Sequence, residues 1–428
     1  MTNKLPQGWV ECEFGKIFEV VNGDRGKNYP AKNKLQTTGI PFVSAVNIQD
    51  GKLREDNLLC LTDEQYNLLN NGKINTEDTL LCIRGSIGKH CRYFKEKGAI
   101  ASSMVIIRRN QFEVLNSLLH YYLDSHIMKA EIKKYDNGTA QPNLSAADLR
   151  KFYFPLPPLN EQKRIVEKIE EEFWKIDEGV EKLKLAQEQI KQYRQSVLKS
   201  AFDGKLYKTT EWEEKTLEEI TSILGDGLHG TPKYSDDGDY YFINGNNLND
   251  GVIQIKDDTK KVDEIEYQKY KKELNENTVF VSINGTLGNT AFYNNEKIIL
   301  GKSACYFNLL PIANKEFIRF LLKTNNFINY ANTNATGSTI KNVSLKTMRA
   351  FKINLPTLDE QKQIVKEIEK RFEVADEAEK IITENLENAE RLKQSILKKA
   401  FEGRLVPQDP TDQPASELLA QIQAERSK

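Results

Sequence analysis

The stretch PPLNEQKRIV at residues 157–166 returns as PTLDEQKQIV at residues 356–365, which is 199 positions later. The same offset carries AFDGKL at residues 201–206 onto AFEGRL at residues 400–405, and no insertion or deletion separates the two matches. An internal repeat of this kind sets the architecture of a whole chain, so it takes precedence over local structure. The 428-residue chain is therefore predicted to contain two copies of one unit.

Looser matches extend the repeat upstream. NIQDG at residues 47–51 matches NLNDG at 247–251, and IRGSIG at 83–88 matches INGTLG at 283–288, both at an offset of 200. Trp9 corresponds to Trp212. Each copy is thus a divergent block of about 150 residues followed by a better-preserved block of about 45. This asymmetry indicates that the first block varies with function while the second keeps one shared role.

The preserved block is predicted to be a long helix with one apolar seam, because its apolar residues follow 4-3-4-3 spacing. Asn160 and Asp359 are predicted as the N-caps, and Gly204 and Gly403 as the C-terminal stops. The seam positions are Ile169, Phe173, Ile176, Val180, Leu183, Ile190 and Val197 in the first copy, and Ile368, Phe372, Ala375, Ile382, Leu386, Ala389 and Ile396 in the second. The polar residues that interrupt the seam are Gln187, Arg194, Glu379 and Lys393.

Each helix would run ~65 Å at ~1.5 Å per residue. Because both seams match and the remaining helix surfaces are heavily charged, we expect the two helices to pair with each other, antiparallel, as an intramolecular coiled coil. Packing of each helix on its own domain is the alternative.

The variable blocks combine strand and helix patterns. Apolar runs at residues 79–83 and 278–283 are of strand length and precede glycine-containing turns, and residues 101–107 form another strand candidate. Residues 115–123 and 316–322 follow helical patterns. The expected fold is therefore α+β, with recognition-type domains at 1–154 and 205–353, helical spacers at 155–204 and 354–405, and a tail at 406–428.

Charge and cysteine content place few constraints on function. The formal net charge is −1 and the pI is about 6.5, although residues 1–154 carry 21 Lys and Arg against 17 Asp and Glu. A nucleic-acid surface would have to be a local patch. The five cysteines are scattered without a Cys-x-x-Cys pair, and no apolar run approaches the roughly 18 residues that span a membrane. We expect a cytoplasmic chain without disulfides.

Motifs for catalysis are absent or incomplete. GDGLHG at residues 225–230 fits the dinucleotide-binding pattern, but TPKY follows it instead of a helix start. GKS at 301–303 imitates the end of a phosphate-binding loop, yet Glu296 stands where its first glycine is required. The four histidines form no zinc motif. No catalytic residue, cofactor or metal is therefore predicted for this chain.

The layout of two variable domains alternating with two similar long helices resembles the specificity subunit of type I restriction–modification systems. The repeated Pro-x-Leu-x-Glu-Gln-x-x-Ile-Val motif looks like the family's entry to its helical regions. GRLVPQDP at 403–410 is similar to the family's C-terminal tail, and GTAQPNLS at 138–145 to a segment that closes a recognition domain. GSTIKNVS at 337–344 lacks the Gln-Pro pair of its counterpart, so the two copies differ there.

The resemblance implies a non-catalytic adaptor. Each domain would read one half of a bipartite, asymmetric target in double-stranded DNA, and the paired helices would fix the gap between the halves. Family members dock two modification subunits, which bind S-adenosylmethionine and methylate adenine. Restriction subunits, which use ATP and Mg²⁺, join complexes that also cleave. An assembly scaffold without DNA affinity and a metal-dependent nuclease remain alternatives.

Side chains in glycine-rich turns are the candidates for DNA contact, because Arg reads guanine, Asn reads adenine, and Ser or Lys holds phosphates. Solvated turns are the alternative for all of them, and turn capping is the alternative for the two asparagines at 47 and 247. The first copy offers Arg25, Lys27, Asn47, Arg84, Ser86, Lys89, Thr139, Gln141 and Asn143; the second offers His229, Thr231, Lys233, Asn247, Asn284, Thr286, Asn289, Ser338, Thr339 and Lys341.

Overall fold

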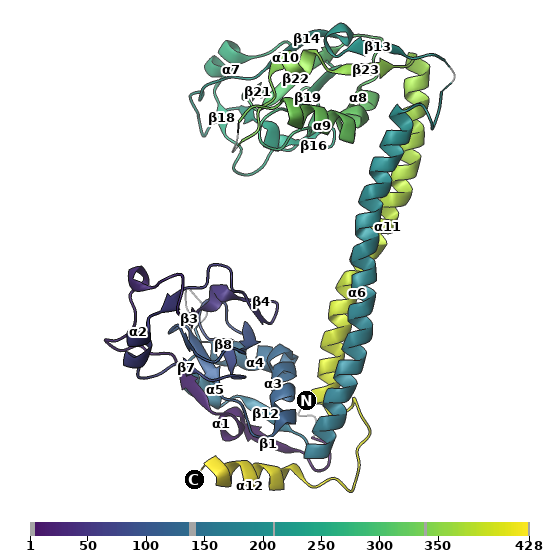
Figure 1. The fold of residues 1–428 in the computed structure, drawn as a ribbon. Coiled ribbons are helices and arrows are strands. Elements are labelled where there is room, and N and C mark those ends of the chain that lie inside the picture. The colour runs from purple at the N-terminus through teal and green to yellow at the C-terminus, as the bar shows by residue number, and fades with distance from the viewer. Residues whose placement is uncertain (1–4, 137–142, 209, 338–339, 427–428) are drawn as a thin grey trace. The chain divides into compact units, whose positions relative to one another are not determined.

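A computed structural model of the chain describes residues 5–136, 143–208, 210–337 and 340–426 (Figure 1). The chain divides into two compact units, Met1–Lys182 with Asn385–Lys428, and Leu183–Glu384. Each unit holds one mixed α/β domain and part of both long helices, α6 (Leu159–Phe202) and α11 (Leu358–Phe401). The predicted α+β class is confirmed, while the five segment boundaries stay a prediction.

The domain of the first unit contains two four-stranded sheets, with strand orders β2-β11-β8-β9 and β6-β3-β10-β7, and the pairs β1-β12 and β4-β5. Its strands are β1 (Val10–Glu13), β2 (Val20–Asn22), β3 (Ile40–Val43), β4 (Ile48–Gln49), β5 (Lys52–Leu53), β6 (Cys60–Leu61), β7 (Lys73–Ile74), β8 (Thr79–Cys82), β9 (His90–Arg92), β10 (Gly98–Ile100), β11 (Met104–Ile107) and β12 (Tyr153–Leu156). Its helices are α1 (Phe14–Ile17), α2 (Asp63–Leu68), α3 (Glu113–Asp124), α4 (His126–Tyr135) and α5 (Ala146–Arg150), with 3-10 turns η1 (Lys32–Lys34) and η2 (Ala45–Asn47).

The domain of the second unit repeats this plan with sheets ordered β14-β22-β19-β20 and β18-β15-β21, and the pairs β13-β23 and β16-β17. Its strands are β13 (Glu213–Thr216), β14 (Thr221–Asp226), β15 (Tyr240–Ile243), β16 (Leu248–Asn249), β17 (Val252–Ile253), β18 (Lys261–Val262), β19 (Thr278–Ser282), β20 (Thr290–Phe292), β21 (Ile298–Leu300), β22 (Ala304–Leu309) and β23 (Lys352–Leu355). Its helices are α7 (Glu264–Tyr270), α8 (Lys315–Leu322), α9 (Asn325–Asn334) and α10 (Leu345–Arg349), with η3 (Glu218–Ile220) and η4 (Gly245–Asn247).

Strand register confirms the sequence repeat residue by residue. Val105 pairs with Leu81 in the first unit, and Cys305 pairs with Val281 in the second. The strands expected at 79–83 and 278–283 are β8 and β19, each of which ends one residue early. Only Met104–Ile107 of the run at 101–107 is strand, because the Met104 amide donates to the Ala101 carbonyl and closes a turn there. That turn becomes part of the site described below.

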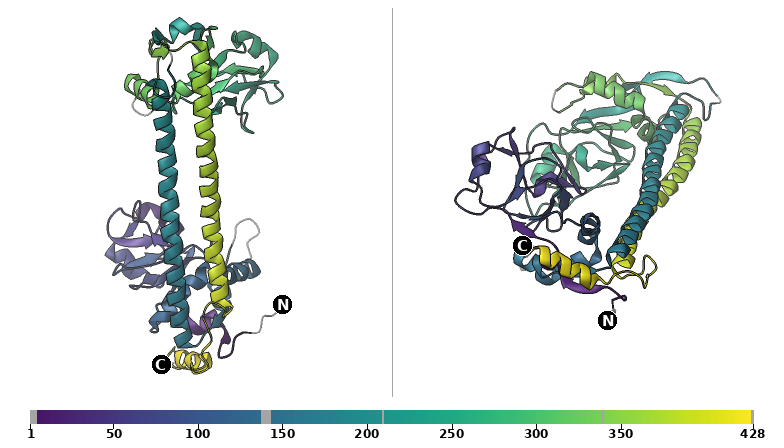
Figure 2. Two further views of the ribbon diagram at one scale, coloured as in Figure 1. Left: turned by 90° about the vertical axis from the view of Figure 1, so that its right-hand side faces the viewer. Right: turned by 60° about the horizontal axis from the view of Figure 1, so that its bottom comes forward.

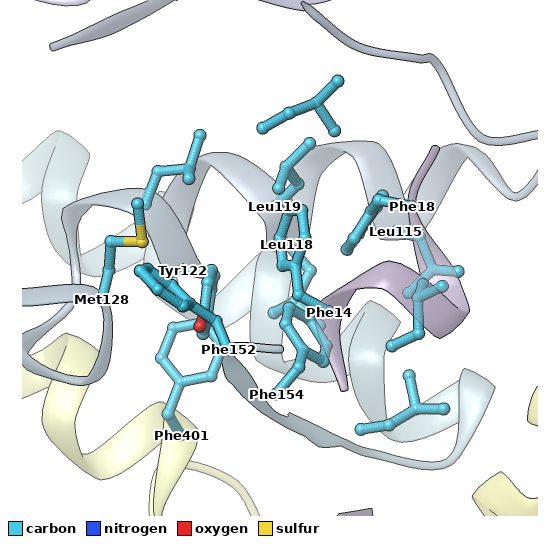
Figure 3. Close-up of a cluster of buried hydrophobic side chains, with 14 of the residues drawn as sticks. Phe14, Phe18, Leu115, Leu118, Leu119, Tyr122, Met128, Phe152, Phe154 and Phe401 are labelled. Atoms are coloured by element: carbon cyan, nitrogen blue, oxygen red, sulfur yellow. The ribbon is translucent and has the colours of Figure 1, made fainter. Parts of the chain in front are cut away.

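An aromatic core holds the domain of the first unit together (Figure 3). Helical spacing on α3 places Leu115, Leu118, Leu119 and Tyr122 on one face, where all four are buried. The ring of Phe154 on β12 lies 4.7 Å from that of Tyr122. Burial of these side chains against the sheet supplies the main driving force for the domain to fold.

The long helices pair in antiparallel fashion within each unit (Figure 2). In the first unit Ile169, near the beginning of α6, and Ile396, near the end of α11, belong to one buried core. In the second unit Val197, near the end of α6, and Ile368, near the beginning of α11, belong to another. Every predicted seam residue is buried or half-buried. The predicted intramolecular pairing is therefore confirmed.

The helix starts differ from the prediction by one or two residues. Because α6 begins at Leu159 and α11 at Leu358, Asn160 and Asp359 lie inside the first turn and are not N-caps. In the second copy Thr357 takes the capping role, since its hydroxyl accepts from the Glu360 amide at 3.4 Å. Gly204 and Gly403 end the helices as predicted, with φ of +72° and +64° in the left-handed region.

The C-terminal helix α12 (Ala415–Arg426) belongs to the first unit and packs on α1. Its apolar residues Ala415, Leu418 and Ile422 are buried, and the Arg426 guanidinium donates to the Gly15 carbonyl at 2.7 Å. The tail is therefore an integral part of the first unit's core.

Candidate nucleic-acid interface

A short turn connects β8 to β9 in the first unit and β19 to β20 in the second. Gly85 and Gly88 adopt φ of +69° and +89°, and their counterparts Gly285 and Gly288 adopt +75° and +85°. Such backbone conformations favour glycine, because a Cβ atom would clash there. The two turns therefore share one backbone frame, from which the first copy presents arginine at position 84 and the second presents asparagine at the equivalent position 284.

The segment before α5 or α10 pairs with this turn. In the first unit Arg84 and Asn143 form an isolated bridge, and the Arg84 Nε donates to the Asn143 Oδ1 at 3.0 Å. In the second unit Asn284 bridges Asn342, and the Gly285 amide donates to the Lys341 carbonyl at 3.0 Å. The structure thus brings these predicted residues together. Four further candidates lie outside the described residues, namely Thr139, Gln141, Ser338 and Thr339.

A glycine-bounded loop leaves the end of β2 or β14 beside that turn. Asn22 pairs with Val105, and Asp226 pairs with Cys305, so Arg25 and His229, each three residues further on, occupy equivalent positions. The preceding glycines are also equivalent. A Cβ on Gly23 would lie 2.7 Å from the Ala101 carbonyl oxygen, and one on Gly227 2.4 Å from that of Gly301.

Four segments therefore meet in each domain. We call residues 23–27, 84–89, 101–103 and 143 the first loop cluster, and residues 227–231, 284–289, 301–303 and 340–342 the second loop cluster. The turns at 101–103 and 301–303 are hydrogen-bonded to the residues just before the turns at 84–89 and 284–289. The amides of Ile83 and Ile283 donate to the carbonyls of Ser103 and Ser303 at 2.9 and 3.0 Å.

The first loop cluster gathers positive charge. Arg25 donates to the Ser102 carbonyl at 3.3 Å, and its pKa is lowered by partial burial and then by the charge of Arg84, so the two guanidinium groups are close enough to repel. Asp24 is buried and accepts from the amides of Gly26 and Asn70, both at 2.7 Å. The Gly26 hydrogen bond is the main reason why the pKa of Asp24 is lowered, so this carboxylate shapes the loop that carries Arg25. Two adjacent cations of this kind suit an anionic ligand.

The second loop cluster is more polar than charged. It borders a cleft of about 430 Å³ lined by His229, Asn284, Lys302 and Asn342, among others. The His229 Nε2 lies 2.6 Å from the Asp226 Oδ2, which orients the imidazole. Amide, imidazole and ammonium groups can hydrogen-bond to base edges and to phosphates.

Asn47 and Asn247 do not belong to the loop clusters, and of the two interpretations of these residues the structure supports turn capping instead of DNA contact. Both are buried, with 4% and 5% of their surface exposed. The Asn47 Oδ1 accepts from the Ser44 amide at 3.0 Å, and the Asn247 Oδ1 accepts from the Asn244 amide at 2.9 Å. These side chains cap the turns η2 and η4, which removes them from the surface that a duplex could reach.

The remaining candidates lie in or next to the loop clusters. Asn289 is half-buried, and its amide donates to the Ser282 hydroxyl at 2.9 Å. Lys341 is exposed, and its ammonium donates to the Asn332 Oδ1 at 2.6 Å. The other exposed candidates are Lys27, Ser86, Lys89, Thr231, Lys233 and Thr286.

Comparison with known proteins decides the family. The model described as the type I restriction modification DNA specificity domain matches residues 6–182 and 209–388, which is most of the chain. The chain belongs to this family. The two matched regions each contain one domain with its loop cluster and more than half of the following long helix, so both copies of the repeat are specificity domains.

Whole-length relatives carry the same assignment. The type I restriction enzyme StySPI specificity subunit of Salmonella potsdam is 28% identical, over 99% of this chain and 96% of the relative. The EcoKI specificity subunit of Escherichia coli K12 is 26% identical, over 99% and 97%. The chain therefore spans almost the full length of characterised type I specificity subunits.

Solved structures share the fold. A chain of a type I R-M system, solved to address complex assembly and conformational transition, matches with a TM-score of 0.70 at 20% identity, over 94% of this chain and all of that chain. The HsdS subunit from Thermoanaerobacter tengcongensis matches with a TM-score of 0.50 at 18% identity, over 94% and 99%. At these identities the likeness establishes the specificity-subunit fold alone.

The repeated Glu-Gln motif of this specificity subunit has a structural role that its sequence did not reveal. The Trp9 indole donates to the Glu161 Oε2 at 2.9 Å, and the Gln408 amide donates to the other oxygen at 2.6 Å. Burial raises the pKa of Glu161. In the second copy the Trp212 indole donates to Glu360 at 3.4 Å. The motif therefore fastens the first strand of each domain to the start of its long helix, and the matched tryptophans were the only sequence signal for this contact.

Within the described part of this specificity subunit, no group of three or more His, Cys, Asp and Glu side chains is placed to hold a metal ion. Among the same residues no helix is long and apolar enough to cross a membrane.

The cysteines provide a first prediction. All five are buried thiols, and burial raises the pKa of Cys12 and Cys91 to about 12 and that of Cys82 to about 11. Since the thiolate is the reactive form, we expect a thiol-specific reagent at pH 8 to modify none of the five in the folded chain and all five after unfolding in denaturant. Mass spectrometry of the labelled protein measures the count. Rapid labelling of any cysteine under native conditions would contradict the buried positions.

Proposed function

We propose that this chain is the DNA-reading component of a type I restriction–modification complex, acting in the cytoplasm. The first loop cluster reads one half of a bipartite, asymmetric target in double-stranded DNA, and the second loop cluster reads the other half. The paired helices α6 and α11 set the spacing between the halves. Two modification subunits that bind S-adenosylmethionine dock on the helical parts, and restriction subunits using ATP and Mg²⁺ join those complexes that also cleave DNA. The chain itself takes no part in bond making or breaking.

One observation supports DNA reading above all others. The two loop clusters have the same backbone frame and different hydrogen-bonding side chains at equivalent positions. Arg25 of the first cluster corresponds to His229 of the second, and Arg84 corresponds to Asn284. A scaffold that contacts identical partners through both domains would be expected to keep these side chains alike. A pair of readers for two different half-sites requires them to differ while the frame persists.

The side chains also indicate which bases are read. Arginine is the common bidentate partner of guanine O6 and N7, whereas asparagine pairs with adenine N6 and N7. Because the Asn143 Oδ1 holds the Nε of Arg84, the guanidinium is oriented before any ligand arrives. We therefore assign a guanine contact to Arg84 and an adenine contact to Asn284, each in its own half-site.

The preserved helical blocks fit a shared docking role. Both copies keep their helix sequence because each would meet the same modification subunit, whereas the loop clusters diverge because their half-sites differ. The exposed charges along α6 and α11 are arranged mainly in pairs within one helix, as Lys182 with Glu178 and Arg391 with Glu387. Such pairs contribute little to stability, which leaves these surfaces available to a protein partner.

A domain exchange with methylome sequencing tests the proposal. The chain is expressed with its own modification subunit, and methylated adenines are mapped across the DNA of the host cell. Exchange of residues 1–154 for the matching domain of a related specificity subunit is expected to change one half of the methylated target and leave the other half and the gap unchanged.

Three results would contradict the proposal. A change in both halves, or in neither, would show that the domains do not read separate half-sites. Absence of salt-dependent binding of the assembled complex to duplex DNA would favour a scaffold. Cleavage of DNA by the purified chain with a divalent metal would favour a nuclease.

A further inference from the structure

Two polar residues interrupt the apolar seam at equivalent places, 199 positions apart: Arg194 on α6 and Lys393 on α11. Each lies mostly out of solvent, with 27% and 21% of its side chain exposed. A cation in a helix seam destabilises the pair unless it finds a partner, so such residues commonly fix the register of a coiled coil.

In the second unit Arg194 joins both helices. Its Nη2 lies 2.5 Å from the Asp376 Oδ1 and 2.9 Å from the Glu379 Oε2, both on α11. The guanidinium also lies 5.8 Å from the ring centre of Phe372, a cation–π distance. That ring in turn meets Phe320 of α8 edge-on at 5.7 Å.

In the first unit Lys393 makes the equivalent contacts with the helices exchanged, except for the contact to Glu379, whose counterpart is Val180. Its ammonium lies 2.5 Å from the Asp177 Oδ1 and 5.3 Å from the ring centre of Phe173, both on α6. Phe173 meets Tyr121 of α3 edge-on at 5.8 Å. The residues in these contacts all match their counterparts in the second unit at an offset of 199.

The next residue in each copy is a glutamine that reaches the end of the same domain helix. Gln394 donates to the Asp124 carbonyl at the end of α3, at 3.3 Å. Gln195 donates to the Lys323 carbonyl at the end of α8, also at 3.3 Å. We call Lys393 with Gln394 the first clamp, and Arg194 with Gln195 the second clamp. Each clamp ties three helices together: α6, α11 and the domain helix α3 or α8.

We propose that the two clamps are positioning elements, which fix the register of the helix pair and the position of each domain on that pair. They thereby fix the gap between the two DNA half-sites. This inference rests on the proposed function, because it concerns the spacing of two DNA-reading domains. A slip of the antiparallel helices by one heptad would take Lys393 away from Asp177 and Arg194 away from Asp376 together. The two ion pairs therefore select one register in both units at once.

The test uses the full chain in complex with its modification subunits. Methylation is measured on duplexes that carry the native half-sites with the native gap or a gap one base pair longer or shorter. The variants are Lys393→Ala and Arg194→Ala. The chain supplies its own conservative replacements, Lys393→Arg and Arg194→Lys, since each installs the residue of the other copy. Arg391→Ala and Lys182→Ala are matched controls, because these exposed cations pair with a carboxylate of their own helix, Glu387 and Glu178.

We expect the two alanine variants to lower the preference for the native gap by about tenfold, a change that corresponds to an ordinary coupling energy between contacting residues. Half-site bases should stay the same, and the conservative variants and controls should keep the native preference. Alanine variants with an unchanged preference for the native gap would overturn the clamp inference and leave the proposed function intact. Failure of the unaltered complex to recognise two half-sites at all would overturn the proposed function itself.

Charge exchange keeps the inference testable if an alanine variant does not fold. Lys393→Asp alone should lose gap preference or folding, and the double variant Lys393→Asp with Asp177→Lys should regain both, because the ion pair is restored in reversed order. A double variant that folds, as measured by thermal unfolding, but does not regain the native gap preference would overturn the inference.

Discussion

Replacement of Phe154 by alanine is expected to lower the free energy of unfolding of the first unit's domain by about 3–5 kcal/mol, the usual cost of removing a buried phenyl ring. The side chain is fully buried. Its ring lies 4.7 Å from that of Tyr122, 5.6 Å from Phe18 and 6.3 Å from Phe14, so alanine leaves a cavity among three aromatic neighbours (Figure 3). Tyr122 is also fixed by the hydrogen bond from its hydroxyl to the Tyr153 carbonyl at 2.7 Å, which restricts how far the site can collapse.

Hydrogen exchange followed by mass spectrometry suits this prediction, because a chain of two units need not unfold in one step. Amides of β8, β11 and β12 should exchange faster in the variant, while those of β19, β22 and β23 in the second unit should not change. Phe94→Ala is the control, since it removes the same ring from a site that is 67% exposed. Equal effects of the two replacements would contradict the proposed aromatic core.

Replacement of Arg84 by alanine is expected to weaken binding of the assembled complex to its target by about 5- to 150-fold, which corresponds to the loss of one bidentate base contact of about 1–3 kcal/mol. Discrimination at a single guanine in the first half-site should disappear, whereas preferences in the second half-site should stay. The physical reason is the preorganisation of the guanidinium by Asn143 and its place beside Arg25 in the first loop cluster. Equilibrium binding to duplexes with single base changes measures both effects.

Two controls separate base reading from charge. Arg84→Lys keeps the charge and removes the planar fork, so it should behave like alanine for base discrimination while retaining part of the affinity. Arg54→Ala removes a cation of the same domain that is paired with Asp56 on the surface, and it should have little effect. If Arg84→Ala weakened all sequences equally and reduced the salt dependence by about one counterion, Arg84 would be a phosphate contact instead of a base contact.

Much of the architecture could be predicted from the sequence because it depends on local periodicity. The 4-3-4-3 seam, with residues such as Ile169 and Ile368, identified the long helices, and the offset of 199 placed a second copy of each. Pairing of the two helices followed, because their seams match and the remaining helix surfaces are heavily charged. The helix ends were less accurate at Asn160 and Asp359, since capping depends on the geometry of a single turn.

The candidate site was predicted only in part. Arg84 and Asn284 were found because they follow matched strands, but the equivalence of Arg25 and His229 became visible only through the register of β2 with β11 and of β14 with β22. The roles of Asn47 and Asn247 stayed open, because the same asparagine pattern serves a surface contact or a buried turn cap.

By itself, then, the sequence determined the repeat, the fold class, the helix pair and the family, since each of these is encoded in residues that are close together or regularly spaced. Only the tertiary structure decided which side chains share a loop cluster and how Arg194 and Lys393, which interrupt the seam, are satisfied. The partners of those two cations, Asp376 and Asp177, lie 182 and 216 residues away in the chain. Contacts over such separations arise from packing of the whole unit, which no local pattern records.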